Sequence, residues 1–445
     1  MNHHFPRYHL RPLRGYLNDP NGPVLVDGVL HLYFQSRPTT DTSTPVQWGH
    51  ATSTDLVTWQ LHRPAMTPVP GGPDSDGCYS GNVIATPQGL MAFYSGYIEH
   101  KRFQSVLTAR SLDGGFSFGT PTQVLPDPRP DDGVVMFRDP FVWYAEPSWR
   151  MAVGAEMEGE RPAVRLYESG DLESWSLLGN LVEGERTHID GLDTGAGWEC
   201  PQVVTVGGDD IVVVSPFAHV GWQGSTVLSL GRRSVQRVDH GSNFYAASVL
   251  RSSPHGPIMF GWMPEACEAS LWRKRGWAGV ISLPRVLGLG SRGELLSDPV
   301  PALSSLRVDA LPADSAVTSS PSFELRLPHV SGTARIEFGP RERLEITVDL
   351  VAGLVVIDRD HASVDPRAHR GVMRIPDAFD EARASDAVRV FVDGSCVEVF
   401  TSGGRVASTR VYPSSPPPWS VEAPAGSYLH HLGGCTVVPR RSDEG

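Results

Sequence analysis

The sequence has little cysteine, no long apolar run and a deficit of positive charge, and each of these absences excludes a class of protein. Its five cysteines are odd in number and include no CxxC pair, which argues against a disulfide framework or a zinc site. They are Cys78, Cys200, Cys267, Cys396 and Cys435. No run approaches about 18 apolar residues, and the segment 1–15 has no signal-peptide core. We therefore expect free thiols and a soluble, cytoplasmic protein without membrane partners.

The charge balance excludes further partners. Thirty-eight Lys and Arg residues stand against 50 Asp and Glu residues, for a formal net charge of −12, and they form no basic stripe. Nucleic acid and anionic membranes are therefore not expected ligands, whereas a small neutral ligand suits this balance. A chain of 445 residues exceeds one typical core, so we expect two domains. The sequence does not decide between a monomer and a homo-oligomer.

Helical periodicity is also scarce. Short runs of β-branched and aromatic residues recur between turn signals, among 46 glycines and 38 prolines, which predicts an all-β protein. Five strong strands are expected at 30–36, 90–96, 149–155, 210–216 and 257–263.

A repeat precedes these strands. The segments LNDPNGPV, CYSGNVIA, FRDPFVW, WECPQVV and NFYAASV align on Asp19, Ser80, Asp139, Cys200 and Tyr245, at spacings of 61, 59, 61 and 45 residues. A second repeat places Asp55, Asp113 and Asp171 at intervals of 58 residues. Five copies of a multi-strand unit of this length predict a five-bladed β-propeller over residues 1–295.

In a propeller the matching positions converge at one mouth of the central channel. Asp19, Asp139 and Glu199 would then lie around one funnel. Taken alone, Asp19 in LNDPNG could serve only to form a turn, because Asp-Pro and Asn-Gly are common turn dipeptides. Three acids that converge on one funnel favour a functional site, since like charges at close range repel and shift each other's pKa.

The composition changes after about residue 290. Residues 296–322 are rich in Pro, Ser and Asp, which is typical of a connector. Strand-like runs follow over 323–440, and Asp393-Gly394 between two apolar runs indicates a hairpin. We expect a β-sandwich there, without a catalytic constellation.

The motifs LNDPNG (17–22), FRDP (137–140) and WECP (198–201), in this order and spacing, resemble glycoside hydrolase family 32, the invertase, inulinase and levanase group. Similar blocks extend over essentially the whole chain, including FVDGSCVEVF (391–400). The resemblance implies a five-bladed propeller followed by a β-sandwich. It also implies a retaining hydrolase that cleaves terminal β-D-fructofuranosyl linkages of sucrose or small fructo-oligosaccharides.

By this resemblance Asp19 is the nucleophile that forms a covalent fructosyl intermediate, Glu199 is the general acid/base, and Asp139 stabilises the transition state. Such a reaction needs two carboxyl groups about 5–5.5 Å apart and no cofactor or metal. The positions that would bind substrate are Asn18, Gln35, Tyr79, Ser80, Arg138 and Trp262. Arg138 is expected to keep Asp139 ionised, and the alternative is that the two form a purely structural bridge. For Trp262 the alternative to substrate binding is packing in the core.

Two departures from the family pattern concern the pocket wall. Tyr16-Leu17 replaces the usual Trp-Met, and the loop 36–47 has no aromatic residue. Sucrose, short inulin- or levan-type oligosaccharides and fructose dianhydrides therefore stay open as substrates. The alternatives are a fructosyltransferase, an inverting five-bladed arabinan- or xylan-cleaving enzyme, and a non-catalytic sugar-binding propeller.

Overall fold

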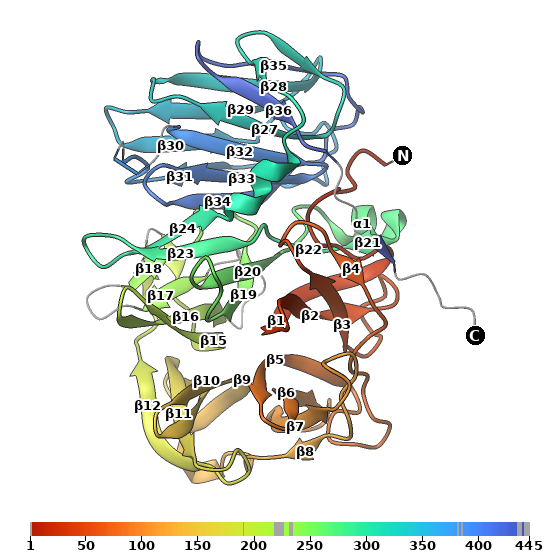
Figure 1. The fold of residues 1–445 in the computed structure, drawn as a ribbon, viewed down its shortest axis with the longest axis vertical. Coiled ribbons are helices and arrows are strands. Elements are labelled where there is room, and N and C mark those ends of the chain that lie inside the picture. The colour runs from red at the N-terminus through yellow and green to blue at the C-terminus, as the bar shows by residue number, and fades with distance from the viewer. Residues whose placement is uncertain are drawn as a thin grey trace.

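The computed structural model describes residues 2–189, 191–217, 227–230, 235–380, 382–383, 386–433 and 438–439. These residues form an all-β protein in which a stack of strands from the C-terminal part covers one end of a group of N-terminal sheets (Figure 1). The only α-helix among them is α1 (Ala269–Arg275), and it is too short to cross a membrane. Two 3-10 helices span Pro130–Asp132 and Pro301–Leu306.

Five sheets make up the N-terminal part. The first has the order β21–β1–β2–β3–β4–β37, with bounds Trp277–Ala278, Gly15–Val26, Val29–Arg37, Gln47–Ser53, Gln60–Leu61 and Val438–Pro439. The second contains β5 (Gly77–Thr86), β6 (Gly89–Tyr97), β7 (Ser105–Ser111) and β8 (Thr122–Gln123). The third contains β9 (Val134–Ala145), β10 (Ser148–Met157), β11 (Arg161–Ser169) and β12 (Ser176–Glu183).

The fourth and fifth sheets complete this part. The fourth contains β15 (Gly197–Val206), β16 (Asp209–Phe217), β17 (Leu228–Leu230) and β18 (Val235–Arg237). The fifth contains β19 (Tyr245–Leu250), β20 (Ile258–Met263), β23 (Arg285–Leu289) and β24 (Leu295–Pro299), with β22 (Val280–Ile281) also paired to β20. A hairpin of β13 (His188–Ile189) and β14 (Leu192–Asp193) stands apart. The five strands expected from the sequence correspond to β2, β6, β10, β16 and β20.

Two six-stranded sheets form the C-terminal part. One has the order β25–β36–β27–β32–β33–β34, with bounds Leu311–Pro312, Tyr428–His431, Ser322–Leu327, Val388–Asp393, Cys396–Thr401 and Val406–Arg410. The other has the order β26–β35–β28–β29–β30–β31, with bounds Ala316–Thr318, Trp419–Glu422, Gly332–Gly339, Glu342–Asp349, Leu354–Asp358 and Val372–Ile375. Buried side chains of both sheets share one core, as in a sandwich. The hairpin expected at Asp393-Gly394 joins β32 to β33.

The segment 296–322, which we expected to be a connector, is packed into both parts. Its first residues belong to β24 of the fifth sheet, and β25 and β26 pair with β36 and β35. Leu303 and Leu306 of the intervening 3-10 helix are buried. The Pro- and Ser-rich composition therefore reflects short strands and turns rather than a free linker.

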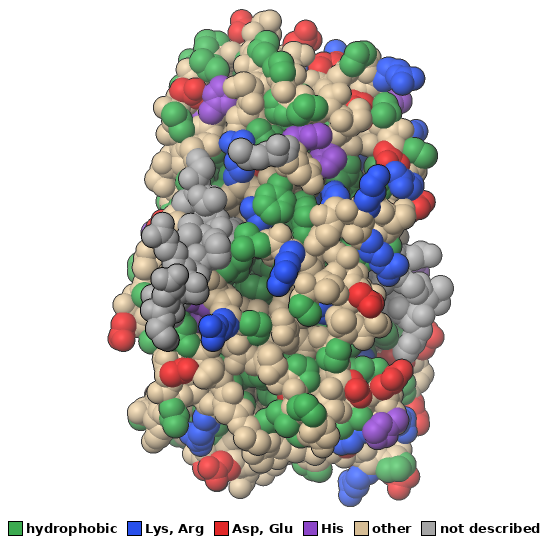
Figure 2. Space-filling model, turned by 90° about the vertical axis from the view of Figure 1, so that its right-hand side faces the viewer, with side chains coloured by type: hydrophobic (Ala, Val, Ile, Leu, Met, Phe, Trp, Pro, Cys, Tyr) green, Lys and Arg blue, Asp and Glu red, His purple; other side chains and the backbone are tan. Residues whose placement is uncertain are grey.

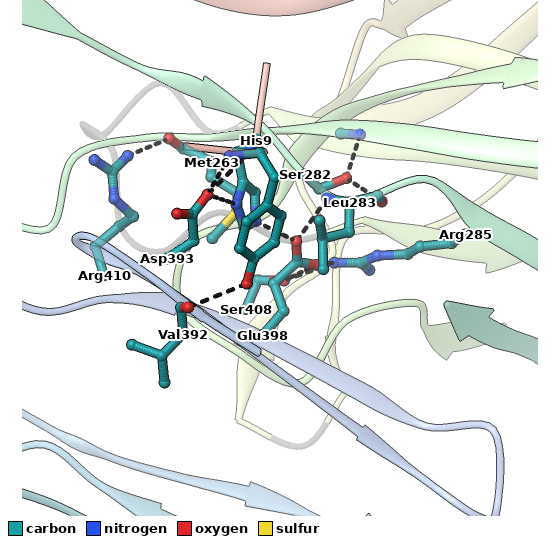
Figure 3. Close-up of polar contacts among 12 residues, drawn as sticks. His9, Met263, Ser282, Leu283, Arg285, Val392, Asp393, Glu398, Ser408 and Arg410 are labelled. Carbon is teal, nitrogen blue, oxygen red and sulfur yellow. Dashed lines mark hydrogen bonds and ion pairs between the residues drawn. The ribbon is translucent and has the colours of Figure 1, made fainter. Parts of the chain in front are cut away.

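A buried network of charged side chains joins the two parts (Figure 3). His9 lies between Asp393 and Glu398, with its ring nitrogens 2.9 and 3.1 Å from their carboxylate oxygens. Arg285 of β23 contacts Glu398 at 2.6 Å and Asp239 at 2.9 Å, and none of these side chains is exposed by more than 1%. Burial lowers the pKa of His9, but its bonds to Asp393 and Glu398 outweigh burial and raise the pKa above its ordinary value. The sandwich is thus joined to the N-terminal part by buried, paired charges.

The four described cysteines, Cys78, Cys200, Cys267 and Cys396, are buried free thiols. Cys435 lies outside the described residues.

Candidate functional site

The first strand of each N-terminal sheet carries a register irregularity at the position of the sequence repeat. In β1 it lies between Leu17 and Pro20, and comparable shifts interrupt β5, β9, β15 and β19. Bulges of this kind bend a strand and redirect its side chains, and they are common next to active sites. Each sheet therefore presents one or two side chains at an interruption of its ladder.

The backbone at three of these positions is left-handed. Asp139, Cys200 and Ala246 have φ angles of 60°, 48° and 49°, which residues other than glycine rarely adopt. The alignment of the fifth copy is therefore corrected by one residue, because Ala246 rather than Tyr245 occupies the equivalent position. The fifth copy is the one with the shorter spacing of 45 residues, so spacing alone did not fix its register.

A cavity of about 340 Å³ lies where these strands meet, a size typical of small-molecule pockets. All nine residues predicted for the site line it: Asn18, Asp19, Gln35, Tyr79, Ser80, Arg138, Asp139, Glu199 and Trp262. Tyr16, Arg37, Thr42 and Tyr245 complete the lining. The cavity thus draws residues from the first strands of all five N-terminal sheets.

Neutral hydrogen-bond donors surround Asp19. Ser80 Oγ donates to Asp19 Oδ2 at 2.6 Å, Gln35 Nε2 donates to the same oxygen at 3.1 Å, and Asn18 Nδ2 donates to Oδ1 at 3.0 Å. Burial raises the pKa of Asp19 to about 6, and the charge of Glu199 adds to the rise while these hydrogen bonds oppose it. The carboxylate is therefore ionised at neutral pH and fixed in orientation.

Asp139 is held by a neighbouring strand on either side. Cys200 N–H donates to its Oδ2 at 3.0 Å, and Ser95 Oγ accepts the Asp139 backbone N–H at 2.7 Å. Burial, and next the charge of Glu199, raise the pKa of Asp139 to about 7, although the positive charge of Arg138 opposes them. The charge of Arg138 thus favours the ionised form of Asp139, but it does not outweigh burial and the charge of Glu199.

Arg138 pairs with Glu199 instead. Its Nη1 donates to Glu199 Oε1 at 2.7 Å, and Tyr245 OH donates to Glu199 Oε2 at 2.7 Å. Asp139 has a left-handed backbone, and its carboxylate oxygens accept from Ser95 Oγ and the Cys200 N–H. Both oxygens of Glu199 are thereby directed by side chains from two other sheets.

Aromatic side chains form the rest of the wall. Trp262 is 5% exposed and lies edge-on to Tyr16 at 6.2 Å between ring centroids, so it both packs in the core and faces the cavity. Tyr79 stacks on Tyr97 at 4.8 Å. The backbone beside Asn18 is also tightly packed, because a Cβ added at Gly279 would lie 1.7 Å from the carbonyl oxygen of Leu17.

Sequence reasoning missed three lining residues, namely Arg37, Thr42 and Tyr245. Tyr245 could have been predicted, because it lies within one of the aligned repeat blocks. Arg37 and Thr42 lie outside these blocks, so the repeat gave no indication of them. Within the described ranges, no group of three or more His, Cys, Asp or Glu residues is arranged to hold a metal ion.

Known proteins resemble this chain over nearly its full length. Residues 9–299 match the family described as glycosyl hydrolases family 32 N-terminal domain, and residues 307–430 match its C-terminal domain. Raffinose invertase of Escherichia coli is 29% identical over 92% of this chain and 90% of its own length. Sucrose-6-phosphate hydrolase of Salmonella typhimurium is 30% identical over 92% and 89%.

Solved structures share the fold. A mutant of the Bombyx mori β-fructofuranosidase in complex with sucrose aligns with a TM-score of 0.79 at 24% identity, over 99% of this chain and 96% of that one. Because both family domains match and together span most of its length, this chain belongs to glycoside hydrolase family 32 and is a glycoside hydrolase.

Proposed function

We propose that this enzyme cleaves the terminal β-D-fructofuranosyl linkage of sucrose or small fructo-oligosaccharides, with retention of configuration and a covalent fructosyl-Asp19 intermediate. The observation that carries the proposal is the different surroundings of two carboxyl groups in one cavity. Asp19 is held by neutral donors, whereas Glu199 is held by Arg138 and Tyr245. Carboxyl groups with separate environments are what a retaining glycosidase uses for separate roles.

In the first step an Asp19 oxygen attacks C2 of the fructosyl unit. The bond from C2 to the leaving oxygen breaks, and Glu199 gives its proton to that oxygen. In the second step Glu199 takes a proton from water, whose oxygen attacks C2 and releases Asp19 and fructose. Asn18 Oδ1, which is buried without a partner among the described residues, is placed to accept a fructose hydroxyl. Asp139 holds further hydroxyls of the same unit.

We propose in addition that the five N-terminal sheets are the blades of a propeller around this cavity. The support is that one first strand from each sheet reaches the cavity. The catalytic domain then extends beyond residue 295 to the end of β24 at Pro299, and the strands of the sandwich run from β25 at Leu311 to β36 at His431. The free thiols of the described cysteines favour work in a reducing compartment, the cytoplasm.

The test is fructose release from sucrose, kestose, inulobiose and levanbiose. We expect release by the wild type and a loss of at least about 10⁴-fold in Asp19→Ala, as for removal of other catalytic nucleophiles. Asp131→Ala, which removes an exposed carboxylate that does not line the cavity, serves as the control and keeps full activity. Mass spectrometry of the Asp19 peptide during turnover checks for the fructosyl adduct. Equal activity of Asp19→Ala and the wild type would refute the proposal.

A further inference from the structure

A small cavity lies at the junction of the N-terminal and C-terminal parts and shares no residue with the catalytic cavity. Its walls come from two segments of the sandwich, the loop 359–370 after β30 and residues 410–412 at the end of β34. A β-bridge between Ala368 and Cys267 places this loop beside the start of α1. Figure 2 shows the face of the molecule that carries α1, and Lys and Arg side chains are spread over its middle.

The size of this cavity limits what it holds. Its volume is about 10 Å³, whereas the catalytic cavity has about 340 Å³. A cavity of about 10 Å³ has room for one water molecule or one ion of similar size. It is therefore too small for a phosphate, a sulfate or a carboxylate group.

A buried cation without a counterion lines this cavity. Arg359 is 5% exposed, and its Nη1 donates to three neutral oxygens. These are Asn243 Oδ1 at 3.3 Å, Thr409 Oγ1 at 2.7 Å and the Arg410 carbonyl oxygen at 3.1 Å. Arg359 Nε is buried, and among the residues that the structure describes it has no hydrogen-bond partner and the guanidinium has no ion pair. A buried charge in this state is costly, because no opposite charge replaces the water that it has lost.

The other fully buried arginines of the junction contact carboxylates. Arg285 contacts two of them, as described above, and Arg410, which also lines the cavity, lies 3.1 Å from Glu265. Glu265 also pairs with Arg275, so this single carboxylate already serves two guanidinium groups. The chain therefore supplies counterions to the neighbours of Arg359 and none to Arg359 itself.

Two further groups of the lining suit an anion. Ser363 is 8% exposed, and its Oγ accepts the Asp365 N–H at 3.1 Å, while its hydroxyl proton has no acceptor within the described part of the chain. Arg370 is exposed and adds a second positive charge to the lining. Burial lowers the pKa of Arg359 and outweighs the opposing charge of Asp360, so that carboxylate does not compensate the buried cation.

We propose that this cavity binds one monatomic anion, of the class of chloride, as the counterion of Arg359. The anion accepts hydrogen bonds from Arg359 Nε and Ser363 Oγ, and it neutralises a charge that the chain leaves unpaired. A water molecule in the same place accepts these bonds but leaves the charge. Arg359 belongs to the sandwich and bonds to Asn243 of the N-terminal part, so the bound anion stabilises the junction between them. This inference does not depend on the proposed function.

The test is urea denaturation in sodium chloride and in sodium gluconate at equal ionic strength, because gluconate is too large for the cavity. At a chloride concentration ten times the dissociation constant, the equilibrium constant for unfolding should fall about tenfold. Arg359→Met, which keeps most of the side-chain length without the charge, should remove this dependence on chloride. Arg374→Gln, which removes an exposed arginine of β31, is the matched control and should keep it.

Crystals of the wild type soaked in sodium bromide give a second readout, which does not require a variant to fold. We expect an anomalous scattering peak of bromide within hydrogen-bond distance of Arg359 Nε. Three results would each overturn the inference: no bromide peak at Arg359, equal stability of the wild type in the two salts, or the same chloride dependence in Arg359→Met as in the wild type. A cavity that holds only water would give the first two.

Discussion

The hydrogen bond from Ser80 to Asp19 gives a quantitative test of the catalytic cavity. Ser80 Oγ donates at 2.6 Å to Asp19 Oδ2 and stabilises its ionised form. A hydrogen bond to a charged group contributes about 1.5 kcal/mol or more. Since one pKa unit corresponds to about 1.4 kcal/mol, Ser80→Ala should raise the pKa of Asp19 from about 6 to about 7. Gln35 remains bonded to the same oxygen and limits the shift.

In the proposed mechanism Asp19 attacks in its ionised form, so a higher pKa of Asp19 makes the activity fall at a higher pH. In the wild type, kcat/KM should fall as the pH drops through about 6, whereas in Ser80→Ala the fall begins about one unit higher.

The measurement is the pH profile of kcat/KM on the cleaved fructoside, with Ser117→Ala as the control. Ser117 Oγ also lies 2.6 Å from an aspartate oxygen, that of Asp113, but this pair is at the surface and outside the cavity. Coincident acidic limbs in Ser80→Ala and the wild type, or a shift of the limb to lower pH, would refute the reasoning.

Two further predictions concern other contacts. Tyr245→Phe removes the 2.7 Å donor to Glu199, so kcat/KM should fall by about tenfold or more while near-UV circular dichroism stays the same; unchanged kinetics would show that Arg138 alone positions Glu199. Arg285→Met leaves Glu398 and Asp239 without their shared cation, and urea denaturation should show a loss of about 3–5 kcal/mol in the free energy of unfolding. A loss below about 1 kcal/mol would contradict the role given to this network.

The strands could be predicted from the sequence because their signal is local. Alternating and β-branched runs marked β2, β6, β10, β16 and β20 to within a few residues. The convergence of Asp19, Asp139 and Glu199 followed from equal spacing, because equivalent positions of equivalent units lie together. These predictions needed no knowledge of which side chains touch.

Pairing between side chains was the part that the sequence did not reveal. Arg138 and Asp139 are neighbours in the chain, yet Arg138 donates its hydrogen bond to Glu199, 61 residues away, and the sequence does not show which of two nearby carboxylates an arginine will choose. For Asp393 the sequence predicted only a place in the turn of a hairpin. In the fold its carboxylate accepts the backbone N–H groups of Arg7, Tyr8 and His9, contacts that no local pattern foretells.

The network around His9 also bears on how the protein is made. During synthesis His9 leaves the ribosome 384 residues before its partner Asp393. Gln60 and Leu61 are separated by nearly as many residues from Val438 and Pro439, which pair with them in parallel. The first sheet therefore remains incomplete until translation is nearly over. Until then β4 has an unpaired edge, and because unpaired strand edges promote aggregation, we expect the nascent chain to need chaperones. Termination of synthesis before β37 leaves a chain in which Asp19, the proposed nucleophile, lies in an incomplete sheet.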